Sequence, residues 1–433
     1  MLESILSITS VALVIVFIIL RVPVAIALGL VGFVGYALLD GFKMAGAVVG
    51  SVPNELIASY TFSVVPLFTL MGSVAAVSGL SADLFRAAES TMRGLRGSLS
   101  MSAIIASALF GAVCGSSVAT AMTMGKVSIP EMLKRKYSPS LAAGSVAAGG
   151  TLGVLIPPSL ILMIYAIIAE QSVAQLFLAA LVPGLILTAL YSLIAFFLGS
   201  NGNLSPNDIQ TATEDHTLEP TIMALAKVWH IGLLFVFTIG GIYSGFFTPT
   251  EAAAVGAFGS IFLGFVLRRL SLTGFKQALF ETVKLVSSIV FIIIASTIYS
   301  YFIVQTGAAK SLASALNELE LSGVSVVIVL CAFYIILGCF LDGLAMMLIT
   351  VPITLPLILS YGMDPVWFGV LLVILIEIGL ITPPLGMNLF VIKAVAPNIK
   401  TSEIYRGVAP FFVAPIILIM ILISWPELTQ LLI

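Results

Sequence analysis

Three carboxylic acids lie inside apolar stretches of this sequence: Glu251, Asp342 and Glu377. If these stretches cross a membrane, each buried charge costs about 2.5 to 3.5 kcal/mol on a lenient insertion scale and needs a cation, a proton or a polar partner. Asp342 lies in a glycine-rich turn and is the first candidate for a functional role. Glu251 follows a Thr-Pro-Thr run that equally indicates a capped helix start. We expect Glu377 either to stabilise a nearby helix break or to line a cavity.

Two apolar stretches, 98–133 and 324–360, each contain a glycine-rich centre. The first centre carries the hydroxyl groups of Ser116 and Ser117, and the second carries Asp342. Each stretch supplies two arms of about 17 residues, roughly 25 Å long, which is short for a full membrane crossing. We therefore predict two re-entrant helical hairpins, because turns at membrane depth are tolerated only where they are buried or line a cavity.

Two proline pairs, Pro157-Pro158 and Pro383-Pro384, interrupt the apolar stretches 141–168 and 366–395. A proline inside a helix removes a hydrogen bond and clashes with the preceding turn, so each pair is expected to divide a long helix. The freed carbonyls and the hydroxyls of a facing hairpin suit an alkali cation, and the half-helix N-termini suit an anion. The pattern predicts two sodium sites with a substrate between them; a packing kink is the alternative.

The composition indicates a membrane protein. Apolar residues make up 60% of 433 positions, and only 18 Lys or Arg and 20 Asp or Glu occur. The mean hydropathy is +1.20, far above that of a soluble globular chain. The 20 prolines argue against a lipid-facing barrel. We predict an all-α polytopic membrane protein with two hairpins and about ten transmembrane helices, near 4–20, 23–39, 53–78, 141–168, 182–199, 228–246, 250–266, 278–304, 366–395 and 408–432.

Basic residues predict the orientation. Arg and Lys flank both ends of 98–133, so both ends should face the cytoplasm. If 324–360 also returns to its starting side, the N-terminus lies outside and most basic residues lie inside. The polar segment 201–227 then becomes a cytoplasmic linker between two halves.

The two halves repeat each other. Pro23 and Pro249 are 226 residues apart, and so are the two proline pairs. We predict a first repeat at 1–200 and a second at 228–433, each with scaffold helices, one hairpin and one broken helix. Because the second repeat begins on the opposite side, the repeats should have inverted topology, a symmetry common in alternating-access transporters. A duplicated scaffold without transport is the alternative.

Several functions are excluded by missing motifs. The sequence has no nucleotide-binding loop, zinc-protease motif or serine-hydrolase motif, and its three cysteines lie at no metal-ligand spacing. We expect no enzyme activity, no use of ATP, no organic cofactor and no nucleic-acid partner. Transport would then be driven by an ion gradient or by partner proteins.

The segment Gly379–Asn388 reads Gly-Leu-Ile-Thr-Pro-Pro-Leu-Gly-Met-Asn and resembles the large membrane subunit of TRAP transporters. The two hairpins, the Gly-Ser-Ser turn and the Leu-Ile-Pro-Pro-Ser break extend this likeness over essentially the whole chain. It implies a sodium-coupled, elevator-type transporter of the ion transporter superfamily in the bacterial inner membrane, with a periplasmic N-terminus. It also implies a small four-helix membrane subunit and a periplasmic binding protein that delivers an organic acid, such as sialic acid or a C4-dicarboxylate.

The resemblance also implies where ions and substrate bind. One sodium ion is expected among Ser116, Ser117, Gly153, Val154 and Pro157. The second is expected among Gly338, Asp342, Thr382, Gly386 and Met387. Candidates for the substrate cavity are Ser159, Glu251, Glu377 and Asn388.

Two other functions remain compatible with the sequence. A stand-alone sodium-coupled carrier of anions or dicarboxylates would share the architecture but would work without partners. A channel or a non-transporting scaffold would show no coupling to an ion gradient.

Overall fold

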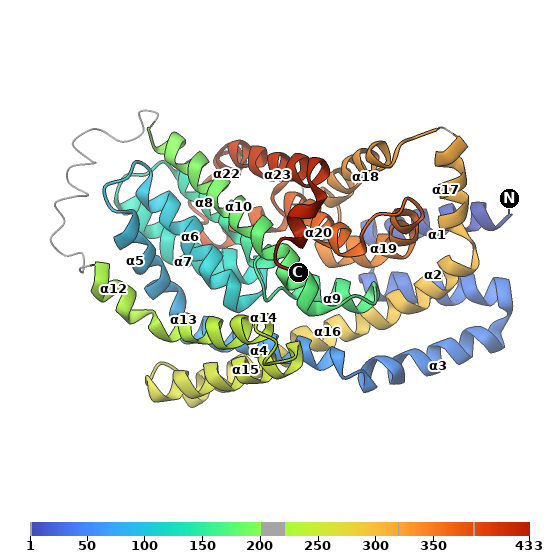
Figure 1. Ribbon diagram of the computed structural model, residues 1–433, viewed down its shortest axis with the longest axis horizontal. Coiled ribbons are helices and arrows are strands. Elements are labelled where there is room, and N and C mark those ends of the chain that lie inside the picture. The colour runs from blue at the N-terminus through green and yellow to red at the C-terminus, as the bar shows by residue number, and fades with distance from the viewer. Residues whose placement is uncertain (1, 201–220, 319, 384–385) are drawn as a thin grey trace.

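The computed structural model describes residues 2–200, 221–318, 320–383 and 386–433. These residues form helices joined by short turns, and no strand occurs among them (Figure 1). The predicted all-α class is therefore confirmed. Pro384 and residues 201–220 of the predicted linker lie outside the described residues.

The helices of the first half follow one another closely. In chain order they are α1 Leu2–Ile19, α2 Val24–Asp40, α3 Phe42–Ala58, the 3-10 turn η1 Thr61–Ser63, α4 Val64–Val77, α5 Leu80–Met92, α6 Ser98–Cys114, α7 Ser117–Lys134, α8 Pro139–Leu155, α9 Leu160–Ile168 and α10 Val173–Ser200. The pair α6 and α7 forms the first predicted hairpin. The pair α8 and α9 forms the first broken helix.

The second half contains the corresponding elements. They are α12 Thr221–Lys227, α13 Trp229–Phe235, the π-helical turn η2 Val236–Gly240, α14 Gly241–Tyr243, α15 Pro249–Val266, α16 Leu272–Gln305, α17 Ala308–Glu318, α18 Gly323–Gly338, α19 Gly343–Ser360, α20 Pro365–Ile381, α21 Met387–Val395, α22 Thr401–Val408, η3 Ala409–Phe412, α23 Val413–Ser424 and η4 Pro426–Gln430. Here α18 and α19 form the hairpin, and α20 and α21 form the broken helix.

Helix ends recur at the interval seen in the sequence. The helices α7 and α19 begin and end 226 residues apart, and so do α8 and α20. Local signals explain this agreement. Ser116 and Asp342 occupy the N-cap positions of α7 and α19, while Pro139 and Pro365 occupy the first turns of α8 and α20. The same short-range chemistry therefore starts equivalent helices in both halves.

Six helices in the described part of the chain are long and apolar enough to cross a membrane, or eight if each of two bent pairs counts as one span. The bent pairs are Phe42–Ala58 with Thr61–Val77, at 64°, and Thr221–Lys227 with Trp229–Tyr243, at 52°. Shorter apolar helices supply the difference from the ten predicted spans, among them α2 and α20. The α19 arm of the second hairpin also reaches the length of a span.

Several boundaries differ from the prediction. Helix α10 begins at Val173, nine residues before the predicted span 182–199. The expected single span at 53–78 is broken, because α3 ends at Ala58 and Ser59 adopts an extended conformation before α4 begins. Helix α12 begins at Thr221, so the final part of the predicted linker is helical. The first break carries no glycine or proline pair that would mark it, and the seven residues 221–227 are too few for their periodicity to predict a helix by itself.

The broken helices form the centre of the molecule. In Figure 1, α20 lies between the first hairpin, α6 and α7, and the second hairpin, α18 and α19, while the long α16 runs along one side. Helix α8 packs against both arms of the first hairpin and against α20. In the broken helix α8–α9, 89% of an 18-residue apolar segment is buried, compared with 28% of such a segment in α16. The first is therefore an interior element, and α16 leaves its apolar surface for lipid or a partner.

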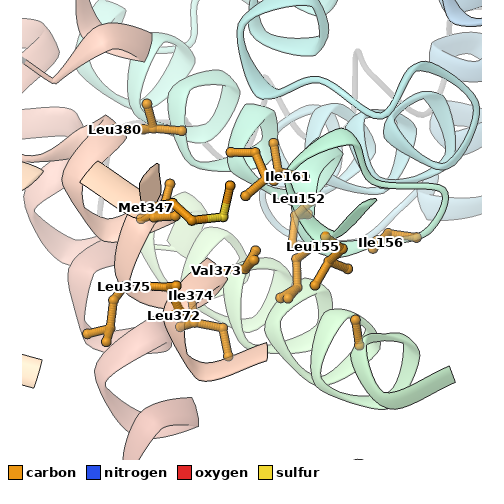
Figure 2. Packing of buried hydrophobic residues seen from close by; sticks show 14 of the residues in the cluster. Leu152, Leu155, Ile156, Ile161, Met347, Leu372, Val373, Ile374, Leu375 and Leu380 are labelled. Atoms are coloured by element: carbon orange, nitrogen blue, oxygen red, sulfur yellow. The ribbon is translucent and has the colours of Figure 1, made fainter. Parts of the chain in front are cut away.

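Figure 2 shows the apolar packing between these central helices. Leu152 and Leu155 of α8 lie near Val373 of α20, and all three side chains are fully buried. Met347 of α19 and Ile161 of α9 belong to the same cluster. This packing joins both broken helices and the hairpins in one continuous, close-packed core.

Candidate ion and substrate site

The tip of the first hairpin rests on the break between α8 and α9. Gly115 ends α6 with a φ of +66°, a left-handed conformation that favours glycine, and Ser116 accepts a hydrogen bond from Ala119 N–H at 3.4 Å. A methyl group on Gly115 would lie 2.7 Å from the carbonyl oxygen of Pro158. The N–H of Leu160 donates to the Gly115 carbonyl at 3.2 Å. The tip and the break are therefore in direct backbone contact.

Local sequence produces the break itself. Helix α8 ends at Leu155, and Ile156 adopts an extended conformation before the proline pair. Ser159 is fully buried and starts α9 by accepting a hydrogen bond from Leu162 N–H at 3.2 Å. The N-terminus of α9, with its partial positive charge, thus begins beside the hairpin tip.

The Thr120 hydroxyl and the Ser116 carbonyl both lie against Gly153 beneath this tip. A methyl group on Gly153 would lie 2.5 Å from the hydroxyl oxygen of Thr120 and 2.9 Å from the carbonyl oxygen of Ser116. Thr120 is fully buried, and among the described residues its hydroxyl has only the Cys114 thiol, a weak partner, within hydrogen-bonding reach. A buried hydroxyl with so weak a partner is costly, so this oxygen is suited to a ligand. Glycine at 153 is what allows the approach.

Thr120 is absent from the set predicted from sequence. It follows Ser116 by four residues, one helical turn along α7, and this spacing was the available signal. Two other predicted ligands, Val154 and Pro157, are buried and carry no polar side-chain atom, so they could contribute only carbonyl oxygens.

Ser117 is the first residue of α7 and connects the two halves of the chain through its side chain. The side-chain amide of Asn388, on α21, donates to the hydroxyl of Ser117 at 2.8 Å and to the carbonyl of Ala147 at 3.3 Å. Asn388 is fully buried, and its side-chain oxygen has no donor among the residues that the structure describes. The amide therefore holds α21 against the first hairpin.

The second group of predicted ligands is only partly brought together. Gly386 approaches the carbonyl oxygens of Leu380 and Thr382, each 2.9 Å from the position of an added methyl group. Gly338 packs on Gly379, three residues before Thr382. The hydroxyl of Thr382 donates to the carbonyl of Ile378 at 2.6 Å.

The other two members of this group are exposed. Asp342 caps α19 by accepting a hydrogen bond from Leu344 N–H at 3.3 Å. Met387 begins α21. Asp342 is nevertheless the positional equivalent of Ser116, 226 residues later, at the tip of the second hairpin.

A cavity opens beside the first hairpin tip. Ser116 and Leu160 lie in its wall together with residues of α4 and α16, and its other polar side chains come from Thr69, Ser73 and Glu281. These three residues were not predicted, because nothing in the local sequence links α4 and α16 to the hairpin. The Glu281 carboxylate accepts a hydrogen bond from Gln277 at 2.9 Å.

None of the four predicted substrate residues lines this cavity. Ser159 and Asn388 make the hydrogen bonds described above. Glu251 is exposed and forms a capping box with Thr248, whose N–H and hydroxyl donate to the carboxylate at 2.8 Å and 2.9 Å. Glu377 is fully buried in α20. The structure thus favours the capping interpretation of Glu251.

Comparison with known proteins agrees with the fold. The crystal structure of the Alcanivorax borkumensis YdaH transporter superposes with a TM-score of 0.62, covering 96% of this chain and 98% of that one, at 14% identity. At this identity the likeness shows an all-α membrane-transporter fold. It gives no information on the substrate.

The family model described as tripartite ATP-independent periplasmic transporter, DctM component, matches residues 11–428. The chain belongs to this family. It is 35% identical to the C4-dicarboxylate TRAP transporter large permease protein DctM of Pseudomonas aeruginosa, over 86% of this chain and 85% of that protein. It is 32% identical to the sialic acid TRAP transporter large permease protein SiaM of Vibrio cholerae, over 87% of each.

Membership of the TRAP large-permease family confirms the resemblance inferred from Gly379–Asn388. The chain is accordingly a multi-pass membrane protein of a transport permease family and not an enzyme. The two relatives are named for different organic acids, so family membership alone does not select between these substrates.

Proposed function

We propose that this chain is the large membrane subunit of a sodium-coupled TRAP importer for an organic acid. The observation that carries the proposal is the hydroxyl of Thr120, which is buried beside the Ser116 carbonyl where the first hairpin meets the broken helix and has only the Cys114 thiol as a weak partner among the described residues. Hydroxyl and carbonyl oxygens are the ligands that hard cations prefer. The site therefore fits sodium by the chemistry of its donors.

Ser116, Thr120 and the backbone around Gly153 would hold the first sodium ion. Ser117 would act beside them through its hydroxyl, which Asn388 positions. The second ion would be held by Thr382 and Gly386 from the break after α20, with Asp342 and Gly338 contributed by the second hairpin. In both places a bound cation would compensate oxygens that have lost helical donors.

The organic acid would bind in the cavity beside the first hairpin tip. The N-terminus of α9 begins there, since Leu160 lines the cavity, and its partial positive charge favours a carboxylate. A sialic acid and a C4-dicarboxylate are the two substrate classes that we propose, because relatives carrying these names match most of the chain.

We propose that the two halves have inverted topology in the bacterial inner membrane, with the N-terminus in the periplasm. Hairpins and broken helices would move together as an elevator past the scaffold helices. A small four-helix membrane subunit and a periplasmic binding protein would complete the transporter. The exposed apolar side chains of α16, such as Phe280 and Phe291, are consistent with a scaffold that meets lipid or another subunit.

Reconstitution into lipid vesicles tests the proposal. Uptake of labelled sialic acid and of labelled succinate is measured with and without an inward sodium gradient, a co-expressed small subunit and a binding protein. We expect uptake of one acid only when sodium and both partners are present. Uptake by the chain alone would support a stand-alone carrier instead, and conductance without gradient coupling would support a channel.

A further inference from the structure

Glu377 occupies an unusual position in the core. It lies on α20 with 0% of its surface exposed, and among the described residues its carboxyl group has only the Thr151 hydroxyl as a hydrogen-bonding neighbour. Neither the proposed sodium sites nor the proposed substrate site includes Glu377. It lines neither the cavity at the hairpin tip nor the apolar cavity between α17, α18 and α19.

The Thr151 hydroxyl on α8 is the hydrogen-bonding neighbour of this carboxyl group, and Tyr191 on α10 is close enough to interact with it electrostatically. Both residues are fully buried. The Thr151 hydroxyl donates to the carbonyl of Ala148 at 2.7 Å and lies 3.3 Å from the Tyr191 hydroxyl. The three side chains therefore form one small polar cluster inside an apolar core.

In the part of the chain that the structure describes, the elements that pack most closely on α20 bring no free positive charge to Glu377. The helices that pack on α20 include α8, α9, α10, α18, α19 and α23, and none of these six contains Asp, Glu, Lys, Arg or His. The remaining neighbours are α21 and η4, which carry Lys393 and Glu427. Lys393 donates to the carbonyls of Pro397 and Ile399, each at 2.8 Å, and Glu427 is exposed.

The tyrosines of α9 and α18 donate their hydrogen bonds to groups other than Glu377. Tyr165 on α9 donates to the carbonyl of Pro365, at the far end of α20. Tyr334 on α18 donates to Thr350 at 2.8 Å, and Cys331 lies on the same helix. Among the described residues of these elements, Tyr191 remains as the titratable group near Glu377. An ionised carboxylate here would be buried without compensation, which is strongly unfavourable.

Binding of a metal ion or of a proton would remove the cost of burying this charge. The tight packing around Glu377 favours the proton. A metal ion needs a shell of several oxygen atoms and room for itself, whereas a proton needs one lone pair of the carboxyl group. Thr151 and Tyr191 supply only two further side-chain oxygens. A neutral carboxylic acid can also donate a hydrogen bond within this cluster.

The position of Glu377 links it to both candidate ion sites. Thr151 and Glu377 are 226 residues apart and occupy equivalent turns of α8 and α20. Each precedes by two residues a glycine that packs on a hairpin, Gly153 in one half and Gly379 in the other. Movement of either hairpin would therefore act on the helix turn that holds this cluster.

We propose that Glu377 is a proton-binding site and that a proton is a second coupling cation in the transport cycle proposed above, on which this inference rests. The carboxyl group is neutral when the broken helices pack as they do here. It gives up its proton at another stage of the cycle, when the packing around Thr151 and Tyr191 changes.

Infrared spectroscopy tests the neutral state without requiring transport. The purified full-length chain in lipid vesicles should show the C=O stretching band of a protonated carboxyl group, and the variant Glu377→Gln should lack it. Glu251→Gln, at an exposed cap, is the matched control and should leave the band unchanged. If Glu377→Gln does not fold, Tyr191→Phe serves instead and should shift the band, because it removes the hydroxyl that lies 3.3 Å from the Thr151 hydroxyl beside the carboxyl group. A spectrum unaffected by the change at 377 or at 191 would overturn the proposal.

Proton movement is then measured in vesicles that carry out sodium-driven uptake and contain a pH-sensitive dye. Wild-type uptake should change the internal pH, and Glu377→Gln should lose that change and the dependence of uptake on external pH. Wild-type uptake with no pH change would refute the coupling role. Absence of any wild-type uptake would contradict the proposed transport function instead, and the infrared result would still decide whether Glu377 binds a proton.

Discussion

Gly379 in α20 packs backbone to backbone on Gly338 in α18. A methyl group on Gly379 would lie 2.8 Å from the Cα atom of Gly338, and the reverse substitution would bring the two equally close. The first half contains the same arrangement, in which Gly111 packs on Gly153. Each hairpin is therefore held against its broken helix by a contact that only glycine permits.

Gly379→Ala should destabilise the protein, because backbone atoms on both sides would have to move. We expect a cost of about 1 to 3 kcal/mol, typical of overpacking, and a strong loss of uptake. Thermal unfolding in detergent measures the first effect and vesicle uptake the second. Gly46→Ala in α3 is the matched control, since an added methyl group there meets nothing within 4 Å. Equal stability of the two variants would contradict the tight contact.

Thr120→Val should weaken sodium binding while preserving the shape of the side chain. Loss of one oxygen ligand should raise the sodium concentration for half-maximal uptake about tenfold, or ~1.4 kcal/mol. Thr120→Ser keeps the hydroxyl and should remain close to the wild type. Thr297→Val, which removes a hydroxyl bonded to Ile293 on α16, controls for the substitution itself. An unchanged sodium dependence in Thr120→Val would remove this residue from the site.

Asn388→Ala should separate α21 from the first hairpin, because the bonds to Ser117 and Ala147 are lost. Buried hydrogen bonds of this kind cost about 1 to 3 kcal/mol when one partner is left unsatisfied. Asn54→Ala, at an exposed position of α3, should have little effect. A thermodynamic cycle with Ser117→Ala checks the contact: effects on unfolding that simply add would show that the two side chains do not interact.

Asp342→Asn should distinguish an ion ligand from a helix cap. Asparagine caps a helix about as well as aspartate, so the helix α19 should remain stable. Removing the charge at the tip of the second hairpin should nevertheless weaken the sodium dependence of uptake. The readouts are thermal unfolding and uptake measured against sodium concentration. If Asp342→Asn retains wild-type sodium dependence, Asp342 acts only as a cap.

Local sequence was sufficient to predict most helix ends in the hairpins and breaks. Gly115 and Ser116 end one helix and start the next through backbone conformation and capping, and the pair Pro157-Pro158 interrupts α8–α9 through sterics. These effects act within a few residues, so the interval of 226 residues was visible without a structure. The break near Ser59 carries no such marker and was missed.

Tertiary structure alone decided which polar groups meet. Ser117 and Asn388 are 271 residues apart, and Thr120 faces Gly153 only because α7 packs on α8. Helices that are apolar on every side have no hydrophobic face from which such contacts can be predicted. For the same reason, the sequence determined that Glu251 and Glu377 need partners, but not that Glu251 caps a helix at an exposed position while Glu377 lies buried beside the Thr151 hydroxyl.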